Sequence, residues 1–165
     1  MLILPQILSF LPWCMAVNVS LNVLGILKKE NRWLREKDVP FDFGASLGRM
    51  RLFGDSVTWF GLVVTFLFGV VAEIFFPGRY LFLEALCVFF GDTVGSFIKR
   101  RAGFARGEFF PFLDHGDYAL VAGAALLALG RISFSAFLAA YAITLIVTPP
   151  ITYLAYRWGL RESAL

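Results

Sequence analysis

The feature that most constrains this chain is its first apolar run, Leu2 to Leu27, which contains no charged side chain. At about 1.5 Å of helical rise per residue, such a run is longer than the roughly 30 Å hydrocarbon core of a bilayer. A cleaved signal peptide has a basic start and a shorter apolar core, whereas this run is followed at once by Lys28 and Lys29. We expect a transmembrane helix that stays in the mature protein.

The composition excludes a soluble globular protein. Hydrophobic residues make up 59% of the 165 residues and charged residues 16%, against roughly 45–50% apolar in soluble domains. The aromatic content of 17% also excludes a disordered chain. Cys14 and Cys87 lie inside apolar runs without disulfide or metal-site spacing, and we expect them to pack as small hydrophobic residues.

Four more apolar runs follow, so the predicted fold is an all-α, polytopic integral membrane protein with five transmembrane helices in one domain, residues 1–165. The predicted spans are 2–27, 57–76, 81–98, 118–130 and 132–156, with polar loops at 28–56 and 99–117. Glu73 and Glu84 flank the short turn that contains Arg79. We interpret these three charges as structural.

The positive charges predict the orientation. Of the 15 Lys and Arg residues, all but Arg79 and Arg131 fall in the two polar loops or the C-terminal tail. Because loops rich in Lys and Arg stay in the cytoplasm, the N-terminus is predicted outside and the C-terminus inside the cell membrane. The net charge of +3 then follows from topology, and no nucleic-acid partner is expected.

Asp92 is the first candidate for chemistry, because a charged side chain near a membrane interior is costly and usually has a partner or a task. A helix places Asp92, Ser96 and Lys99 on one face. Gly91 and Gly95 beside them allow a helix or a ligand to approach closely. The alternative is that Lys99 or a nearby arginine merely neutralises Asp92 at the membrane surface.

Asp114 and Asp117 form a second candidate group. They share a helix face if the helix starts after Pro111, and two carboxylates so placed repel each other unless a cation lies between them. Such oxygen ligands suit Mg²⁺. The alternative for Asp114 is a helix-capping acid. His115 is interpreted as a group beside the site or on the surface, since no nucleophile pairs with it.

The loop 28–56 offers a candidate phosphate site. Gly44, Gly48 and Gly54 allow backbone N–H groups to converge on an anion, and a helix starting at Ser56 or Val57 would point its positive end toward it. All these candidates are predicted on the cytoplasmic side.

Together these segments resemble the archaeal CDP-archaeol synthase family, distant relatives of the phosphatidate cytidylyltransferases. The resemblance covers about Asn18 to Asp117. The residues that carry it are Pro40 to Gly44, Arg51 to Asp55, Thr58, Trp59, Gly61, Gly91, Asp92, Gly95 to Arg101, Pro111, Leu113, Asp114 and Asp117. The chain departs from the family at Val57 and Phe60, where a lysine and an arginine are usual, and at His115, where a glutamine is usual. Arg49, Arg51 or the cluster Lys99 to Arg101 could supply the missing basic groups.

The resemblance implies transfer of a cytidylyl group from CTP to 2,3-bis-O-(geranylgeranyl)-sn-glycerol 1-phosphate taken from the bilayer, which yields CDP-archaeol and pyrophosphate. It implies that Asp92, Asp114 and Asp117 are catalytic and hold one or two Mg²⁺ ions. The residues then expected to bind CTP or phosphate are Gly54, Asp55, Thr58, Trp59, Ser96, Lys99, Arg100 and Arg101, followed by Asp42, Gly44, Arg49, Arg51 and His115. The oligomeric state and a role for K⁺ stay open.

Two other functions fit parts of the pattern. A phosphatidate cytidylyltransferase that makes CDP-diacylglycerol would need the same headgroup chemistry. A small transporter subunit could use Asp92, Glu84 and Glu73 as an ion path, although the other polar groups collect at one membrane face.

Overall fold

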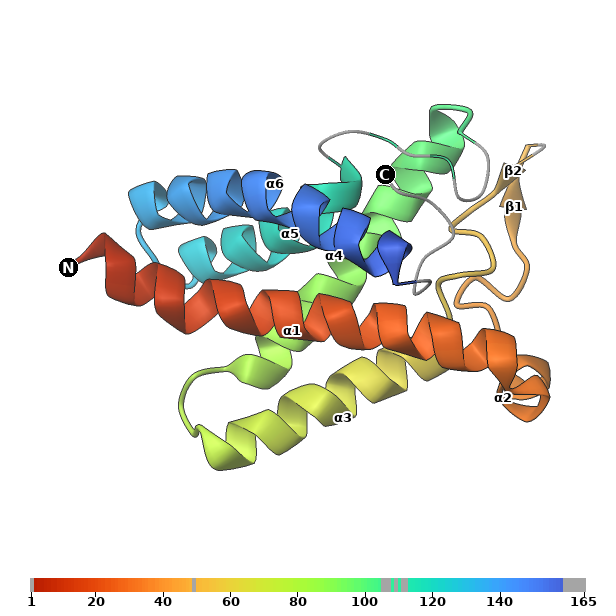
Figure 1. The fold of residues 1–165 in the computed structure, drawn as a ribbon, viewed down its shortest axis with the longest axis horizontal. Coiled ribbons are helices and arrows are strands. Elements are labelled where there is room, and N and C mark those ends of the chain that lie inside the picture. Colours follow the sequence, from red (N-terminus) through yellow and green to blue (C-terminus); the bar gives the residue numbers. More distant parts are fainter. Residues whose placement is uncertain (1, 49, 105–107, 109, 111–112, 159–165) are drawn as a thin grey trace.

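A computed structural model describes residues 2–48, 50–104, 108, 110 and 113–158, and within them the chain is mostly helical (Figure 1). The elements are α1 (Ile3–Glu30), α2 (Arg32–Lys37), β1 (Ser46–Leu47), β2 (Met50–Arg51), α3 (Trp59–Phe75), α4 (Leu81–Arg101), α5 (Leu113–Ala128) and α6 (Phe134–Arg157). The predicted helical class is confirmed. The antiparallel hairpin of β1 and β2 was not predicted, because its strands are too short to show an alternating pattern.

Among the described residues, three helices, α1, α4 and α6, are long and apolar enough to cross a membrane. Helix α3 is a shorter apolar helix of 17 residues, and α5 has 16 residues. Large apolar side chains such as Val63, Leu67 and Ile74 of α3 are exposed on the outside of the bundle. A bilayer would cover such a surface, which in water would be an aggregation hazard.

The helix ends differ from the predicted span limits where polar residues determine them. Helix α1 continues past Leu27 to Glu30. Helix α3 starts later than the predicted Ser56 or Val57, because the Thr58 side chain accepts a hydrogen bond from the Gly61 N–H and caps the helix. Hydropathy locates the apolar stretch of a helix, but it does not show the residue at which a capping side chain starts the helix.

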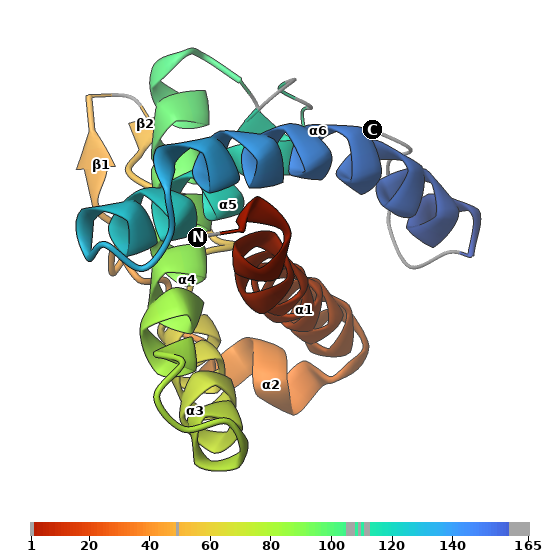
Figure 2. The same cartoon turned by 90° about the vertical axis from the view of Figure 1, so that its left-hand side faces the viewer.

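The last two helices show the same kind of difference. Helix α5 begins at Leu113, before the predicted residue 118, so it includes the polar residues that the prediction had left in the loop. Helix α6 begins at Phe134 after a Ser133 cap and runs through Pro149 and Pro150. Figure 2 shows that α6 is curved, as expected where proline removes hydrogen bonds of the helix.

The buried core lies between α1, α4, α5 and α6. It includes Phe10 and Cys14 of α1, Val88 of α4, Tyr118 of α5 and Ala140 of α6. Both cysteines are free, Cys14 buried and Cys87 half-buried, which confirms their interpretation as packing residues. Helix α3 lies against the outside of α4 (Figure 1).

The hairpin lies at one end of the bundle, next to the C-terminal end of α4 (Figure 1). The loop before α3 is tied to that helix by two backbone hydrogen bonds, from Phe41 N–H to Val57 O and from Trp59 N–H to Val39 O. The Phe41 ring packs on Trp59, with ring centroids 4.8 Å apart, and on Phe89 of α4 at 5.5 Å. These contacts hold the loop against the helices.

Candidate functional site

Helices α4 and α5 approach each other most closely at two glycines. A Cβ atom added to Gly91 would lie 2.6 Å from the Cα of Tyr118, and one added to Gly95 would overlap the carboxylate of Asp117. The expectation that Gly91 and Gly95 admit a close neighbour is confirmed, and the neighbour is α5. This contact places Asp117 against the polar face of α4.

The three aspartates predicted to act together belong to the two helices that make this contact. Asp117 is buried, with 9% of its surface exposed, while Asp92 of α4 and Asp114 of α5 are half-buried. The charges of Asp92 and Asp114 both act on Asp117. Helix packing thus concentrates negative charge at the end of the bundle that carries the loops.

A lysine neutralises part of this charge. Lys99 Nζ donates hydrogen bonds to both carboxylate oxygens of Asp114, at 2.8 and 2.9 Å. Asp114 Oδ2 also accepts the Phe110 N–H at 2.8 Å. The structure therefore pairs Lys99 with Asp114 across two helices.

The donor chemistry of the three aspartates fits Mg²⁺, which prefers carboxylate oxygens. In the part of the chain that the structure describes, however, no three His, Cys, Asp or Glu side chains are grouped closely enough to hold a metal ion. A metal at Asp114 would have to displace Lys99 from its carboxylate.

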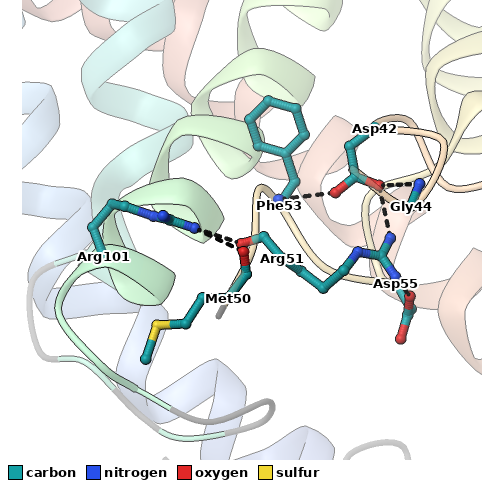
Figure 3. A network of polar contacts seen from close by, with 7 residues as sticks. All are labelled: Asp42, Gly44, Met50, Arg51, Phe53, Asp55 and Arg101. Carbon is teal, nitrogen blue, oxygen red and sulfur yellow. Dashed lines mark hydrogen bonds and ion pairs between the residues drawn. The ribbon is translucent and has the colours of Figure 1, made fainter. Parts of the chain in front are cut away.

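A second polar group surrounds the hairpin (Figure 3). The buried carboxylate of Asp42 accepts a hydrogen bond from Arg51 at 2.7 Å and from the N–H groups of Gly44 and Phe53. Arg51 also donates to Asp55 at 2.8 Å. Burial by itself raises the pKa of Asp42, but the hydrogen bonds from Arg51, Phe53 and Gly44 outweigh it and hold that pKa below its usual value.

Next to this group is a cavity of about 360 Å³. Two arginines from different parts of the chain, Arg51 of β2 and Arg100 near the end of α4, line it. Gly54 has φ +91°, a conformation that favours glycine, and its missing side chain leaves space beside Arg100. The full lining is Met50, Arg51, Gly54, Asp55, Ser56, Arg100, Gly103 and Phe104. A cavity with two guanidinium groups suits an anion with several phosphates.

Three residues predicted to contact phosphate have other partners. Thr58 is buried, caps α3 and accepts a hydrogen bond from Lys28 at 2.7 Å. Trp59 packs on Phe41, and Arg101 donates to backbone carbonyls of the hairpin (Figure 3). Their positions are explained by the fold of the loop.

The remaining predicted residues are placed as follows. Ser96 is half-buried on α4, and Gly44 donates to Asp42. His115 is buried within α5, with 5% of its surface exposed, so it is not a surface group. Arg49 lies outside the described residues.

Sequence reasoning missed several lining residues of the cavity, namely Met50, Gly103 and Phe104, and had considered Ser56 only as a helix start. The sequence offered one signal for Gly103. It is a glycine directly after the basic end of a helix, where a positive φ is common, and its φ is +85°.

Comparison with known proteins shows the family of this chain. A model of the family described as CarS-like, CDP-archaeol synthase, matches residues 76–165, a segment that holds all three aspartates. The chain belongs to the CDP-archaeol synthase family. The resemblance drawn from the sequence motifs is thereby confirmed.

Individual members of the family support the assignment. The chain is 42% identical over 101 residues to the CDP-archaeol synthase of Saccharolobus islandicus, an alignment that covers 56% of this chain and 59% of that relative. The match therefore spans less than two thirds of that relative's length. The CDP-archaeol synthase of Sulfurisphaera tokodaii is 39% identical over 134 residues, covering 74% of this chain and 80% of the relative.

A solved structure shares the fold. It is described as an intramembrane enzyme for archaeal membrane lipids biosynthesis, and it is 31% identical to this chain with a TM-score of 0.58. The alignment covers 78% of this chain and 87% of that one. The fold of this chain therefore agrees with that of an enzyme described as intramembrane.

Proposed function

We propose that this chain is a CTP-dependent lipid-phosphate cytidylyltransferase that forms CDP-archaeol and pyrophosphate. The observation that carries the proposal is that Lys99 and Arg100, two consecutive residues of α4, each contact a different polar group. These consecutive residues link the two polar groups, since Lys99 bonds to Asp114 and Arg100 lines the cavity with Arg51. A polyphosphate bound at Arg100 would thus lie at the same end of α4 as the lysine that holds Asp114.

The proposed lipid substrate is 2,3-bis-O-(geranylgeranyl)-sn-glycerol 1-phosphate. An oxygen of its phosphate attacks the α-phosphorus of CTP, the bond from that phosphorus to the bridging oxygen breaks, and pyrophosphate leaves. Because a phosphate monoester is already ionised near neutral pH, the reaction needs no strong base. Positioning and charge stabilisation then dominate catalysis.

Each polar group has a part in this reaction. Arg100 would supply positive charge to the phosphates of CTP in the cavity, and Arg51, already paired with Asp42 and Asp55, would help to position them. Lys99 would turn from Asp114 toward the reacting phosphates. Asp92, Asp114 and Asp117 would hold one or two Mg²⁺ ions. When bound, Mg²⁺ would supply positive charge next to the phosphate oxygens.

The proposed placement in the cell membrane follows from the charges. One domain of five transmembrane helices, with the N-terminus outside, would put the hairpin, the cavity and the aspartates at the cytoplasmic face, where CTP is available. Helices α3 and α5 are short for a span of about 30 Å, and a membrane accommodates short helices by local thinning. The lipid chains would lie along the apolar outer surface of the bundle.

A direct assay tests the proposal. The purified protein in lipid vesicles is incubated with Mg²⁺, CTP labelled in the α-phosphate, and the geranylgeranyl ether phosphate, and the lipid fraction is analysed for label. We expect labelled CDP-lipid and one pyrophosphate per product. A parallel reaction with diacylglycerol phosphate tests the selectivity for the lipid tails. A hydrophobic surface distinguishes a small difference between tails by only about 1–3 kcal/mol. Absence of label in the lipid with both substrates would contradict the proposal.

A further inference from the structure

The hairpin that carries Arg51 to the cavity is very small. β1 and β2 pair only Ser46 with Arg51 and Leu47 with Met50. An isolated two-stranded hairpin is at best marginally stable in water, even when it is longer than this one. Contacts from outside the hairpin must therefore hold it in place.

Arg101, at the end of α4, makes such contacts. Its guanidinium group donates hydrogen bonds to three backbone carbonyl oxygens of the hairpin. One is that of Leu47 at 3.0 Å, and the others are those of Met50 at 3.3 Å and Arg51 at 2.8 Å (Figure 3). The guanidinium also lies 5.4 Å from the centre of the Phe97 ring on the same helix. One side chain thus joins both strands of the hairpin to α4.

Asp42 holds the side chain of Arg51. The Asp42 side chain is fully buried and accepts a hydrogen bond from the Arg51 guanidinium. The backbone of Arg51 is therefore held by Arg101, while its side chain is held by Asp42 and Asp55. Both ends of Arg51 are constrained where it lines the cavity with Arg100.

We infer that Arg101 is a positioning residue, which clamps the hairpin to α4 so that Arg51 and Arg100 line one cavity. The sequence motif had suggested that Arg101 itself binds phosphate. The role as a clamp depends on the planar, forked guanidinium, which reaches several acceptors at once, and a lysine ammonium does not reproduce it. The inference rests on the proposed function only for the identity of the ligand in the cavity.

The test compares Arg101→Lys and Arg101→Met with a matched control, Arg131→Lys. Arg131 is also an arginine that donates to a backbone carbonyl, Gly78 O at 3.1 Å, and stacks on an aromatic ring, Tyr80 at 4.3 Å, but it belongs to the turns at the other end of the helices. Amide hydrogen exchange is measured on the complete protein without nucleotide. It reports on the hairpin through the Leu52 N–H, which bonds to Ala45 O.

We expect residues 42–55 to exchange at least about tenfold faster in both Arg101 variants, while the core helices and the Arg131 variant exchange like wild type. In the CTP assay we expect both Arg101 variants to raise the KM for CTP by similar factors, between about tenfold and a hundredfold. Wild-type exchange of the hairpin in both variants would overturn the inference. So would a lysine variant with a wild-type KM beside a methionine variant that has lost affinity, because a phosphate contact needs only the charge.

The exchange result does not depend on turnover. If the wild-type protein made no CDP-lipid, the proposed function would fail, and the exchange of the hairpin would still decide whether Arg101 is a clamp.

Discussion

Lys99 and Asp114, which lie on different helices, form a two-pronged ion pair in which Nζ is 2.8 and 2.9 Å from the two carboxylate oxygens. Both side chains are mostly buried, with 13% of Lys99 and 22% of Asp114 exposed. The lysine therefore occupies the position of a cation next to Asp92 and Asp117. If the aspartates bind Mg²⁺, the lysine and the metal compete for Asp114.

The variant Lys99→Met tests this competition. We expect it to lower the stability in Mg²⁺-free buffer by about 1.5–3 kcal/mol, because charged hydrogen bonds are lost and Asp114 is left beside two other carboxylates. Added Mg²⁺ should then raise its melting temperature more than that of wild type. The exposed Lys37→Met serves as control. An equal Mg²⁺ response of Lys99→Met and wild type would remove Asp114 from the proposed metal ligands.

Each of the three aspartates should be needed for turnover. Asparagine keeps the size of the side chain and removes the charge, so Asp92→Asn, Asp114→Asn and Asp117→Asn should each lower CTP turnover by about a hundredfold or more. The exposed Glu36→Gln, which loses only its pair with Arg32, should have wild-type turnover. Any one aspartate variant that kept near wild-type turnover at saturating Mg²⁺ would show that this residue holds no essential metal.

The contact between α4 and α5 should tolerate no side chain at Gly95. Gly95→Ala would push the Asp117 carboxylate away, and we expect a loss of about 1–3 kcal/mol of stability from overpacking together with reduced turnover. Gly25→Ala is the matched control, since a Cβ there meets nothing within 4 Å and α1 is helical at this position. Alanine at position 25 should leave the protein as stable as wild type or stabilise it slightly. Thermal unfolding in detergent compares the two, and equal melting temperatures would contradict the close contact.

The lowered pKa of Asp42 predicts that the stability of the protein depends on pH. Its pKa in the folded protein lies below the usual value of 3.8, so its contribution to stability is complete above that pH and is lost as the pH falls through the lowered pKa. Asp42→Asn lacks the contribution at every pH. The difference in melting temperature between wild type and variant should thus be constant near neutral pH and shrink below about pH 4. A constant difference down to about pH 2 would contradict the ion pair with Arg51.

The turn between α3 and α4 should affect stability without affecting turnover. The Glu73 carboxylate accepts the N–H groups of Gly78 at 2.7 Å and Leu81 at 2.5 Å, so backbone groups satisfy it, while Arg79 lies over the Phe76 ring. Glu73→Gln should cost about 1–2 kcal/mol by weakening charged hydrogen bonds. Its KM for CTP and its kcat should match wild type. A large loss of turnover at unchanged stability would show that this end of the bundle takes part in the reaction.

Much of the fold could be predicted because hydropathy alone identifies apolar helices. The runs that contain α1, α3, α4 and α6 are each uninterrupted enough to be recognised, and the glycines at 91 and 95 indicated a close neighbour. The starts of α3 and α5 were wrong by a few residues, because side-chain caps and polar first turns determine helix ends and carry no hydropathic signal.

The candidate site was predicted only as a set of residues. The motifs named Asp92, Asp114, Asp117, Lys99 and Arg100, and they led to the correct family. They could not show that Lys99 pairs with Asp114 or that Arg101 donates to the hairpin, because each of these contacts joins residues far apart in the chain.

By itself, then, the sequence determined that this is an apolar, helical chain of the CDP-archaeol synthase family with most of its basic residues in two loops. The physical reason is that hydropathy and motif spacing are local properties. Only the tertiary structure decided which charges meet, since the packing of α5 on Gly91 and Gly95 and the docking of the hairpin on Arg101 place side chains from distant segments within hydrogen-bond distance.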